Sequence, residues 1–187
     1  FFKTPKWDNI DIGSKKIFEK FIKKNEKHIK VFDTPSHFND IYHYHKIIHE
    51  TDMANNFQTY YKKSKKKLSK EMISAIERGL KYSAKEYAEA IDFMKRSYES
   101  YKEVFEDYHG VLSPATTGVA DKGLKSTGSP EFCTVWTYMG VPSISLPLLN
   151  GTNDLPLGVQ LIGDKLDDLR FLSVANWLEK NCKNYDE

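Results

Sequence analysis

The sequence GVPSISLPLLN at 140–150, followed by LPLGVQLIG at 155–163, decides the fold class of this 187-residue chain. Two apolar runs, at 141–149 and 157–162, flank a turn sequence at 150–154 that contains Asn, Gly, Thr and Asp. Apolar runs of this length that are bounded by Gly, Pro and Asn are typical of strands. The stretch therefore predicts two strands joined by a turn.

The elements on either side of this stretch follow from similar patterns. Residues 111–114 have the composition of a strand, a Gly/Ser/Thr-rich loop covers 115–130, and a short helix is predicted at 131–139. Asp164 or Asp167 can start a last helix. Its inner face would carry four apolar residues: Leu169, Leu172, Ala175 and Leu178.

Residues 1–108 are mostly helical by their pattern, with short strand-type runs at 1–7 and 29–32. Ser14 offers an N-cap for an amphipathic helix over 14–30. A long helix is predicted over 83–108, because its apolar residues recur in steps of four and three. Further helices are predicted in the His-containing segment after Pro35 and over 68–82.

The order of these elements predicts an α/β layer structure, because strands alternate with helices. We expect a single domain over 1–187, with a helix-rich section at 1–108 and a strand-containing section at 109–187 that carries one wall of a pocket. About four or five strands are expected, and no internal repeat is visible.

Composition excludes several classes of protein. Hydrophobic residues make up 40% of the chain, with 11 Tyr, 11 Phe and 3 Trp, which argues against disorder. No apolar stretch approaches the roughly 18–20 residues of a membrane span. With a net charge of +2 and two cysteines, Cys133 and Cys182, we expect a cytoplasmic protein that has neither a membrane nor nucleic acid as partner.

Several motifs of the second half stand in a recognisable order. They are LSPAT at 112–116, STG at 126–128, Phe132 with Trp136-Thr137, the runs at 140–147 and 155–163, and Asp167-Asp168. Together they resemble the C-terminal third of the amidase-signature family, which includes bacterial amidases, fatty acid amide hydrolase and the A subunit of glutamyl-tRNA amidotransferase. Residues 3–8 and the helix that ends near Glu50 are similar to the middle section of the family, more loosely.

The resemblance implies a fold and an activity. The fold would be the C-terminal part of the amidase-signature fold, a mixed β-sheet covered by helices. The activity would be hydrolysis of a small carboxamide through a Ser, a second Ser in a cis peptide and a Lys, without metal or cofactor. The physical logic is that a hydroxyl nucleophile needs a base within hydrogen-bond reach.

The motif that supplies both serines in the family, Gly-Gly-Ser-Ser-Gly-Gly-Ser, is absent from the sequence. We therefore expect no catalytic residue in this chain, no activity of these 187 residues alone, and a missing N-terminal catalytic portion of the same protein as partner. The chain opens with Phe1 and no initiator Met, which supports that expectation. Open sheet edges would also favour a homo-oligomer. The alternative is a non-catalytic amidase-like subunit or binding module.

The resemblance also implies substrate contacts. An acidic residue nine positions before the Gly of Gly-x-Pro holds the substrate amino group in the amidotransferase branch, and Glu131 stands at that position. The positions near the pocket are matched by Thr127, Gly128, Phe132, Trp136 and Thr137. The alternative is that Glu131 is a first-turn residue stabilised by the helix dipole and that Trp136 belongs to the core. The pair Trp136-Thr137 favours a stand-alone amidase over the amidotransferase branch.

Two clusters of ionisable residues suggest other functions. His45 and His49 are four residues apart and share a helix face, but Glu50 and Asp52 should point elsewhere, so we favour a half-buried face against the sheet over a metal site. The lysine run at 62–70 has the charge of a nucleic-acid surface, but lysine is abundant everywhere in this chain. A solvated segment is the favoured interpretation and a basic nucleic-acid surface the alternative.

Three residues with nucleophilic side chains are assigned structural roles. Ser143 and Ser145 lie in a strand without the Gly-x-Ser-x-Gly pattern of a nucleophile elbow. Cys133 has no Cys-His-Asn spacing around it, so we expect it to be buried.

Overall fold

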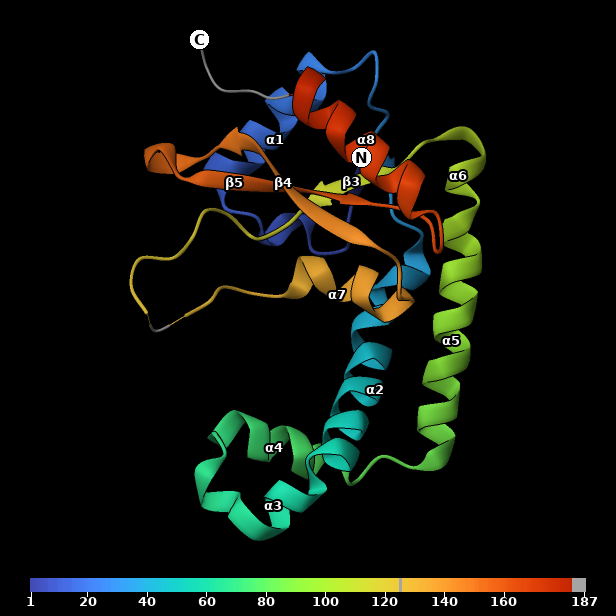
Figure 1. Cartoon of the computed structure of the whole chain (residues 1–187), viewed down its shortest axis with the longest axis vertical. Coiled ribbons are helices and arrows are strands. Elements are labelled where there is room, and N and C mark those ends of the chain that lie inside the picture. Colours follow the sequence, from blue (N-terminus) through green and yellow to red (C-terminus); the bar gives the residue numbers. More distant parts are fainter. Residues whose placement is uncertain (125, 183–187) are drawn as a thin grey trace.

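The computed structural model describes residues 1–124 and 126–182 and shows an α/β protein (Figure 1). A three-stranded antiparallel sheet has the order β3-β5-β4. Its strands are β3 (Val111–Pro114), β4 (Ser143–Asn150) and β5 (Pro156–Ile162). A short parallel pair, β1 (Phe2–Lys3) and β2 (Phe32–Asp33), lies beside β3.

Helices cover both faces of the three-stranded sheet. Helices α1 (Ile12–Lys24) and α8 (Asp168–Asn181) lie over one face, and α7 (Glu131–Met139) lies over the other (Figure 1). The alternation along β5 explains this arrangement, because successive side chains of a strand point to opposite faces. Val159 joins the core with α1 and α8, whereas Ile162 joins the core with α7.

The turn after α7 depends on one glycine. Gly140 ends the helix with a φ of +67°, in the left-handed region that favours glycine. Its backbone N–H donates to the carbonyl of Thr137, and Val141 then leads into β4. The sequence Gly-Val-Pro thus turns the chain from the helix layer into the sheet.

Most of the remaining helices form the lower part of the molecule. Helices α2 (Ile41–Asn56) and α5 (Ala84–Lys102) pack on α7 and run away from the sheet (Figure 1), and α6 (Val104–Asp107) leads into β3. At the far end are α3 (Gln58–Ser64), the 3-10 turn η3 (Lys65–Lys67) and α4 (Lys70–Gly79). Short 3-10 turns elsewhere are η1 (Trp7–Asn9), η2 (Ser36–Asn39) and η4 (Thr152–Asp154).

Residues 57–82, here called the arm, are joined to α2 by a buried carboxylate. Glu50 is 3% exposed and accepts two hydrogen bonds from Arg78, at 2.8 and 2.6 Å, and one from the Tyr82 hydroxyl at 3.2 Å. Helix α4 approaches the backbone of α2 closely, since a Cβ at position 79 would lie 1.9 Å from the carbonyl oxygen of Glu50. Gly79 is therefore required for this packing.

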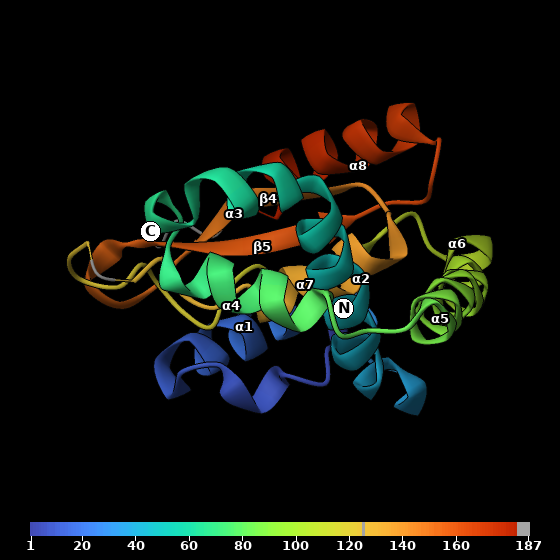
Figure 2. The same cartoon turned by 90° about the horizontal axis from the view of Figure 1, so that it is seen from below.

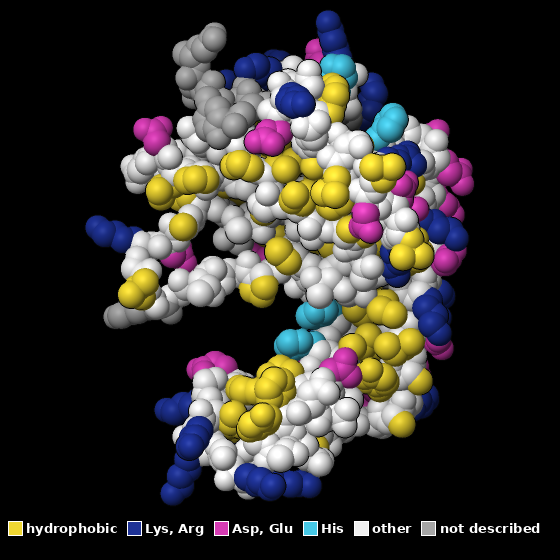
Figure 3. Space-filling model, viewed as in Figure 1, with side chains coloured by type: hydrophobic (Ala, Val, Ile, Leu, Met, Phe, Trp, Pro, Cys, Tyr) yellow, Lys and Arg dark blue, Asp and Glu magenta, His cyan; other side chains and the backbone are white. Residues whose placement is uncertain are grey.

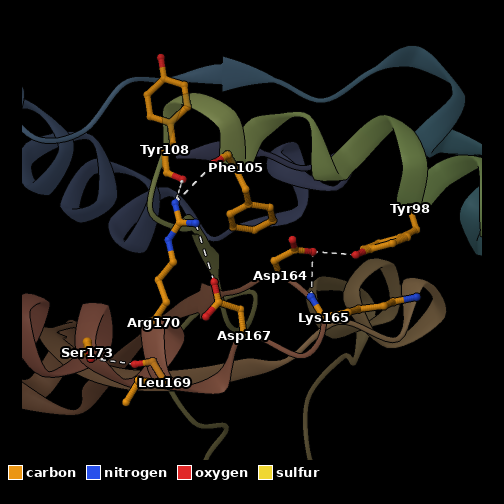
Figure 4. A network of polar contacts seen from close by, with 9 residues as sticks. All are labelled: Tyr98, Phe105, Tyr108, Asp164, Lys165, Asp167, Leu169, Arg170 and Ser173. Carbon is orange, nitrogen blue, oxygen red and sulfur yellow. Dashed lines mark hydrogen bonds and ion pairs between the residues drawn. The ribbon is translucent and has the colours of Figure 1, made fainter.

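A polar network fastens α8 to the α5–α6 segment (Figure 4). The Arg170 guanidinium donates to the backbone carbonyls of Phe105, at 3.4 Å, and Tyr108, at 3.1 Å. The Tyr98 hydroxyl donates to Asp164 at 2.7 Å, just beyond the end of β5. A hollow of about 630 Å³ lies nearby, between α8 and the chain that enters β3.

Three sequence-based expectations about helices are wrong. The first helix ends at Lys24, and its N-cap is Asp11, whose carboxylate accepts from the Ser14 backbone N–H at 2.9 Å; Ser14 itself lies inside the helix. The long helix over 83–108 is interrupted after Lys102.

The inner face of the last helix is also different from the expected one. Leu169 and Leu172 are 83% and 55% exposed, whereas Phe171 is buried beside Ala175 and Leu178. The helix is rotated about its axis because Phe171 offers more apolar surface to the sheet than a leucine does.

In the part of the chain that the structure describes, every helix is too short or too polar to cross a lipid bilayer.

Candidate functional site

The candidate site is a cavity of about 520 Å³ between the 115–130 loop and the α7 side of the sheet. Thr116, Thr127 and Gly128 line it from the loop, and Ser145 and Gly158 line it from β4 and β5. The space-filling view shows the surface hollowed where this loop leaves the body of the molecule (Figure 3). The volume suits a small organic ligand.

The floor of the cavity depends on a close approach of three strands. Ser145 of β4 has Gln160 as its register partner on β5 and also lies close to Gly158, and the backbone N–H of Ala115 donates to the Gly158 carbonyl at 3.1 Å. A Cβ at position 158 would lie 2.7 Å from the Ser145 hydroxyl oxygen and 3.0 Å from the Ala115 Cβ. Gly158 thus keeps this floor open.

A buried polar network fixes the wall beneath the cavity. The Gln160 side-chain amide nitrogen lies within hydrogen-bond distance of the Ser113 hydroxyl (3.0 Å) and of the carbonyls of Phe132 (3.1 Å) and Pro114 (3.3 Å). The Trp136 indole N–H donates to the same hydroxyl at 3.2 Å. Because buried polar groups are costly without partners, this network holds α7 and the start of the loop in one position on β5.

The start of the loop is also held from the other side of the molecule. The Asp11 backbone N–H donates to the Thr117 carbonyl at 2.9 Å. The residue that caps α1 thus also anchors the cavity loop, although the two lie more than a hundred positions apart in the sequence.

Glu131 lies at the first residue of α7, outside the set of residues that line the cavity. Its carboxylate accepts a hydrogen bond from the Asn9 amide at 2.9 Å. Burial raises the pKa of the nearby Tyr42 hydroxyl, and the negative charge of Glu131 raises it further. A carboxylate in the first turn of a helix is favoured by the helix dipole.

Besides Glu131, the other five predicted substrate-contact residues are distributed over three places. Thr127 and Gly128 line the cavity. Phe132 and Trp136 are 0% and 1% exposed and belong to the core behind α7. Thr137 lines a separate hollow of about 350 Å³ between α7, α2 and α5.

His45 and His49 line that same hollow, and their imidazoles stack at 5.6 Å between ring centroids. The shared face is confirmed, but it packs against Tyr138 of α7 rather than against the sheet. Asp52 also lines the hollow, contrary to the expectation, because it lies three residues after His49 on the same helix face. Among the described residues, no group of three or more His, Cys, Asp or Glu is arranged to hold a metal ion.

The expectation that Cys133 is buried is wrong. Cys133 lies on the exposed side of α7, because Phe132, Val135 and Trp136 occupy the buried side. Its thiol is 3.7 Å from the Ala115 carbonyl oxygen, and partial burial raises the pKa of this thiol. The thiol is therefore not activated for nucleophilic attack.

Thr116, Ser145 and Gly158 were not predicted as site residues from the sequence. For Ser145 the available signal was strand alternation. Successive side chains of β4 point to opposite faces of the sheet, so Ser145 faces away from the side that Leu146 faces. Thr116 had no comparable signal, because the path of a loop depends on contacts with distant residues.

Comparison with known proteins gives a consistent result. The family model described as "Amidase" matches residues 10–172. The A subunit of glutamyl-tRNA(Gln) amidotransferase from Alkaliphilus metalliredigens is 32% identical over 108 residues, which are 54% of this chain and 22% of the relative. The mitochondrial A subunit from Anopheles gambiae is 28% identical over 105 residues, 51% of this chain and 21% of the relative.

Solved structures share the fold. A crystal structure of an amidase superimposes with a TM-score of 0.78 at 19% identity, over 94% of this chain and 43% of that one. The amidotransferase A subunit from Thermotoga maritima gives a TM-score of 0.61 at 20% identity, over 96% of this chain and 41% of that one. The chain thus matches about a fifth of the length of these curated relatives and about two fifths of these structures.

Proposed function

Because the chain belongs to the amidase family, we propose that it is part of an enzyme that hydrolyses the C–N bond of a small carboxamide. The observation that supports this proposal most directly is the cavity of about 520 Å³, which lies entirely within the residues that the family model matches. The loop and the strands that form it carry the motifs on which the resemblance rests.

We place the nucleophile and its base outside these 187 residues. Thr116, Thr127 and Ser145 bring hydroxyls to the cavity, but its described lining includes no His or Lys, and within the described residues none of these hydroxyls donates a hydrogen bond to the carboxylate of Asp121 in that lining. An unassisted hydroxyl is a weak nucleophile at neutral pH. In this proposal a Ser, a cis-peptide Ser and a Lys from the catalytic portion perform the acyl transfer, and the present chain binds and orients the amide without a cofactor.

The six residues from the family pattern receive different roles in this proposal. Thr127 and Gly128 contact the substrate, since they line the cavity. Phe132 and Trp136 position α7 from behind, because both are buried. Glu131 and Thr137 flank the site at the two ends of α7, where Glu131 would pair with a cationic group of the substrate.

The proposal is tested with a hybrid protein. The portion of an amidase relative that precedes the matched segment is fused to residues 1–187, and hydrolysis of simple amides is measured. We expect turnover in the hybrid and none in the 187-residue chain alone. Gly158→Leu should abolish turnover because its side chain would fill the cavity floor, whereas Gln58→Ala, on the exposed helix α3, is the matched control.

A folded hybrid without turnover, checked by circular dichroism, would favour a non-catalytic amidase-like subunit instead. Turnover by the 187-residue chain alone that is lost in Ser143→Ala or Ser145→Ala would contradict the assignment of the nucleophile. A slower hybrid with Glu131→Gln, on a substrate that carries an amino group, would support the proposed role of Glu131.

The outer edge of β4 supports association with further polypeptide. Within the described residues β4 pairs only with β5, and its sequence SISLPLLN has no charged residue in a chain that is 29% charged. Natural edge strands are protected by charges, prolines or bulges; β4 contains Pro147 and a register shift between Leu146 and Leu149 but has no charge. We expect the chain to self-associate when expressed alone, and a monomer at high concentration in analytical ultracentrifugation would argue against it.

A further inference from the structure

The arm concentrates the positive charge of the molecule. Residues 57–82 contain eight basic and two acidic residues, a net charge of +6, whereas the whole chain has a net charge of +2. The rest of the chain therefore carries a net charge of −4. A separation of this size produces a local positive field that the total charge conceals.

The lysines at the tip of the arm have no packing function. The residues in question are Lys62, Lys63, Lys66, Lys67 and Lys70. All five are exposed, and neither α3 nor η3 buries any residue. Lysines on α1 differ from them, because they form the solvent side of a helix whose other side buries Phe18 and Phe21.

The same five lysines are also electrostatically uncompensated. In the part of the chain that the structure describes, Lys65 pairs with Glu77 at 2.7 Å and Arg78 pairs with Glu50, but none of the five has an ion-pair partner. The arm projects from the lower end of the molecule, away from the sheet (Figure 2 shows α3 and α4 from below). Their charges are thus available to a partner.

The chemistry of the tip favours a phosphate polymer over a membrane. Among residues 62–70 the apolar side chain is Leu68, which is half-buried, and the exposed apolar side chains of the arm, Phe57, Tyr60 and Leu80, lie outside this stretch. Residues 62–70 themselves therefore offer no apolar surface for insertion into lipid. Several separated cations that reach solvent independently are suited to the phosphates of a nucleic-acid backbone. The absence of Arg from 62–70 indicates contacts without base specificity, since base edges are read mostly by bidentate groups.

We propose that the tip of the arm, residues 62–70, binds the phosphate backbone of a nucleic acid without sequence preference. The site is distant from the cavity described above and does not depend on the proposed amidase activity. Failure of one proposal therefore leaves the other unaffected.

The test is salt-dependent binding of a fluorescein-labelled 20-nucleotide RNA, measured by fluorescence anisotropy from 50 to 200 mM KCl. We expect a Kd in the range of about 10⁻⁴ to 10⁻⁶ M, as for other non-specific complexes, which weakens as salt rises. In the variant with Lys62, Lys63, Lys66 and Lys67 changed to Gln, the slope of log K against log salt should fall by about 3, since each phosphate contact on a single strand contributes about 0.7.

The matched control changes four exposed lysines elsewhere, Lys16, Lys23, Lys27 and Lys30, to Gln. It has the same net charge as the arm variant, and we expect its slope to change by less than about 1. Equal effects of the two variants would overturn the proposal, since binding would then follow total charge. Absence of RNA binding at 50 mM KCl, or binding to vesicles of 30% phosphatidylserine in its place, would also overturn it.

Discussion

The sheet with α7 and the arm use their polar groups in opposite ways. Around β5, the Gln160 amide and the Trp136 indole N–H are buried and bonded to partners far away in the sequence. In the arm, most charged groups face solvent, and one buried carboxylate, Glu50 of α2, holds the whole segment in place. Substitutions near β5 should therefore affect the whole molecule, whereas substitutions in the arm should remain local.

The largest difference between the two regions is expected for aromatic truncation. Trp136→Ala should lower the free energy of unfolding by about 3–5 kcal/mol, because it empties a fully packed site. Tyr60→Ala in the arm, where the side chain is 60% exposed, should change it by less than about 0.5 kcal/mol. Denaturant titration of both variants measures the contrast, and equal losses would contradict it.

A smaller effect is expected from the buried amide. Gln160→Leu removes the donor to the Phe132 and Pro114 carbonyls, and we expect a loss of about 2–4 kcal/mol in the free energy of unfolding because these acceptors stay buried. Gln58→Leu on α3 is the exposed counterpart and should be nearly neutral. A neutral Gln160→Leu would show that the network does not hold α7.

A substitution where α4 of the arm packs on α2 should have a local effect on stability. Gly79→Ala places a methyl group against the Glu50 carbonyl and should destabilise the packing of α4 on α2 by about 1–3 kcal/mol. Hydrogen exchange should increase in the arm while amides of β5 stay protected. Ser74→Ala, on the exposed side of α4, is the control, and exchange that also increases in β5 would contradict the separation of the two regions.

The smallest expected effect is a pH dependence of stability that arises from His45 in α2, the helix that connects the two regions. Burial, and then the proximity of His49, lower the pKa of His45 below its ordinary value of about 6.5. As the pH decreases, His45 is therefore protonated in the unfolded chain before it is protonated in the folded one. The free energy of unfolding keeps its full value above a pH of about 6.5 and decreases as the pH falls through that value. Unfolding curves at pH 7.5 and 5.5 should show a larger loss for the unmodified protein than for His45→Gln, and the exposed His43→Gln should behave like the unmodified protein.

Much of the fold near β5 follows from local sequence. The helix at 131–139 has the predicted bounds, and the strands at 111–114, 141–149 and 157–162 appear within two residues of their expected limits. Gly, Pro and Asn at the ends of apolar runs restrict the backbone over a few residues, so the ends of these strands could be predicted from the sequence. The rotation of α8 could not be predicted, because both leucine and phenylalanine can occupy the buried side of a helix. Only packing against the sheet selects between them.

The candidate site was predictable only in part. Thr127 and Gly128 belong to a motif and line the cavity, whereas Thr137 in the same family pattern faces a different hollow on the far side of α7. Residues along a helix diverge by about 100° per position, so neighbours in a motif need not share a pocket. Ser145 was assigned a structural role because its contact with Gly158 exists only once β4 pairs with β5, where the register partner of Ser145 is Gln160.

Local sequence patterns were sufficient to predict the order of the elements, the α/β class and the family pattern, since these depend on residues that lie near one another in the chain. Tertiary structure alone decided that Asn9 meets Glu131, that Gln160 meets Ser113, and that Lys65 of the arm pairs with Glu77. The reason is physical. Contacts between distant segments are fixed by packing and burial of the whole core, and these have no local signature.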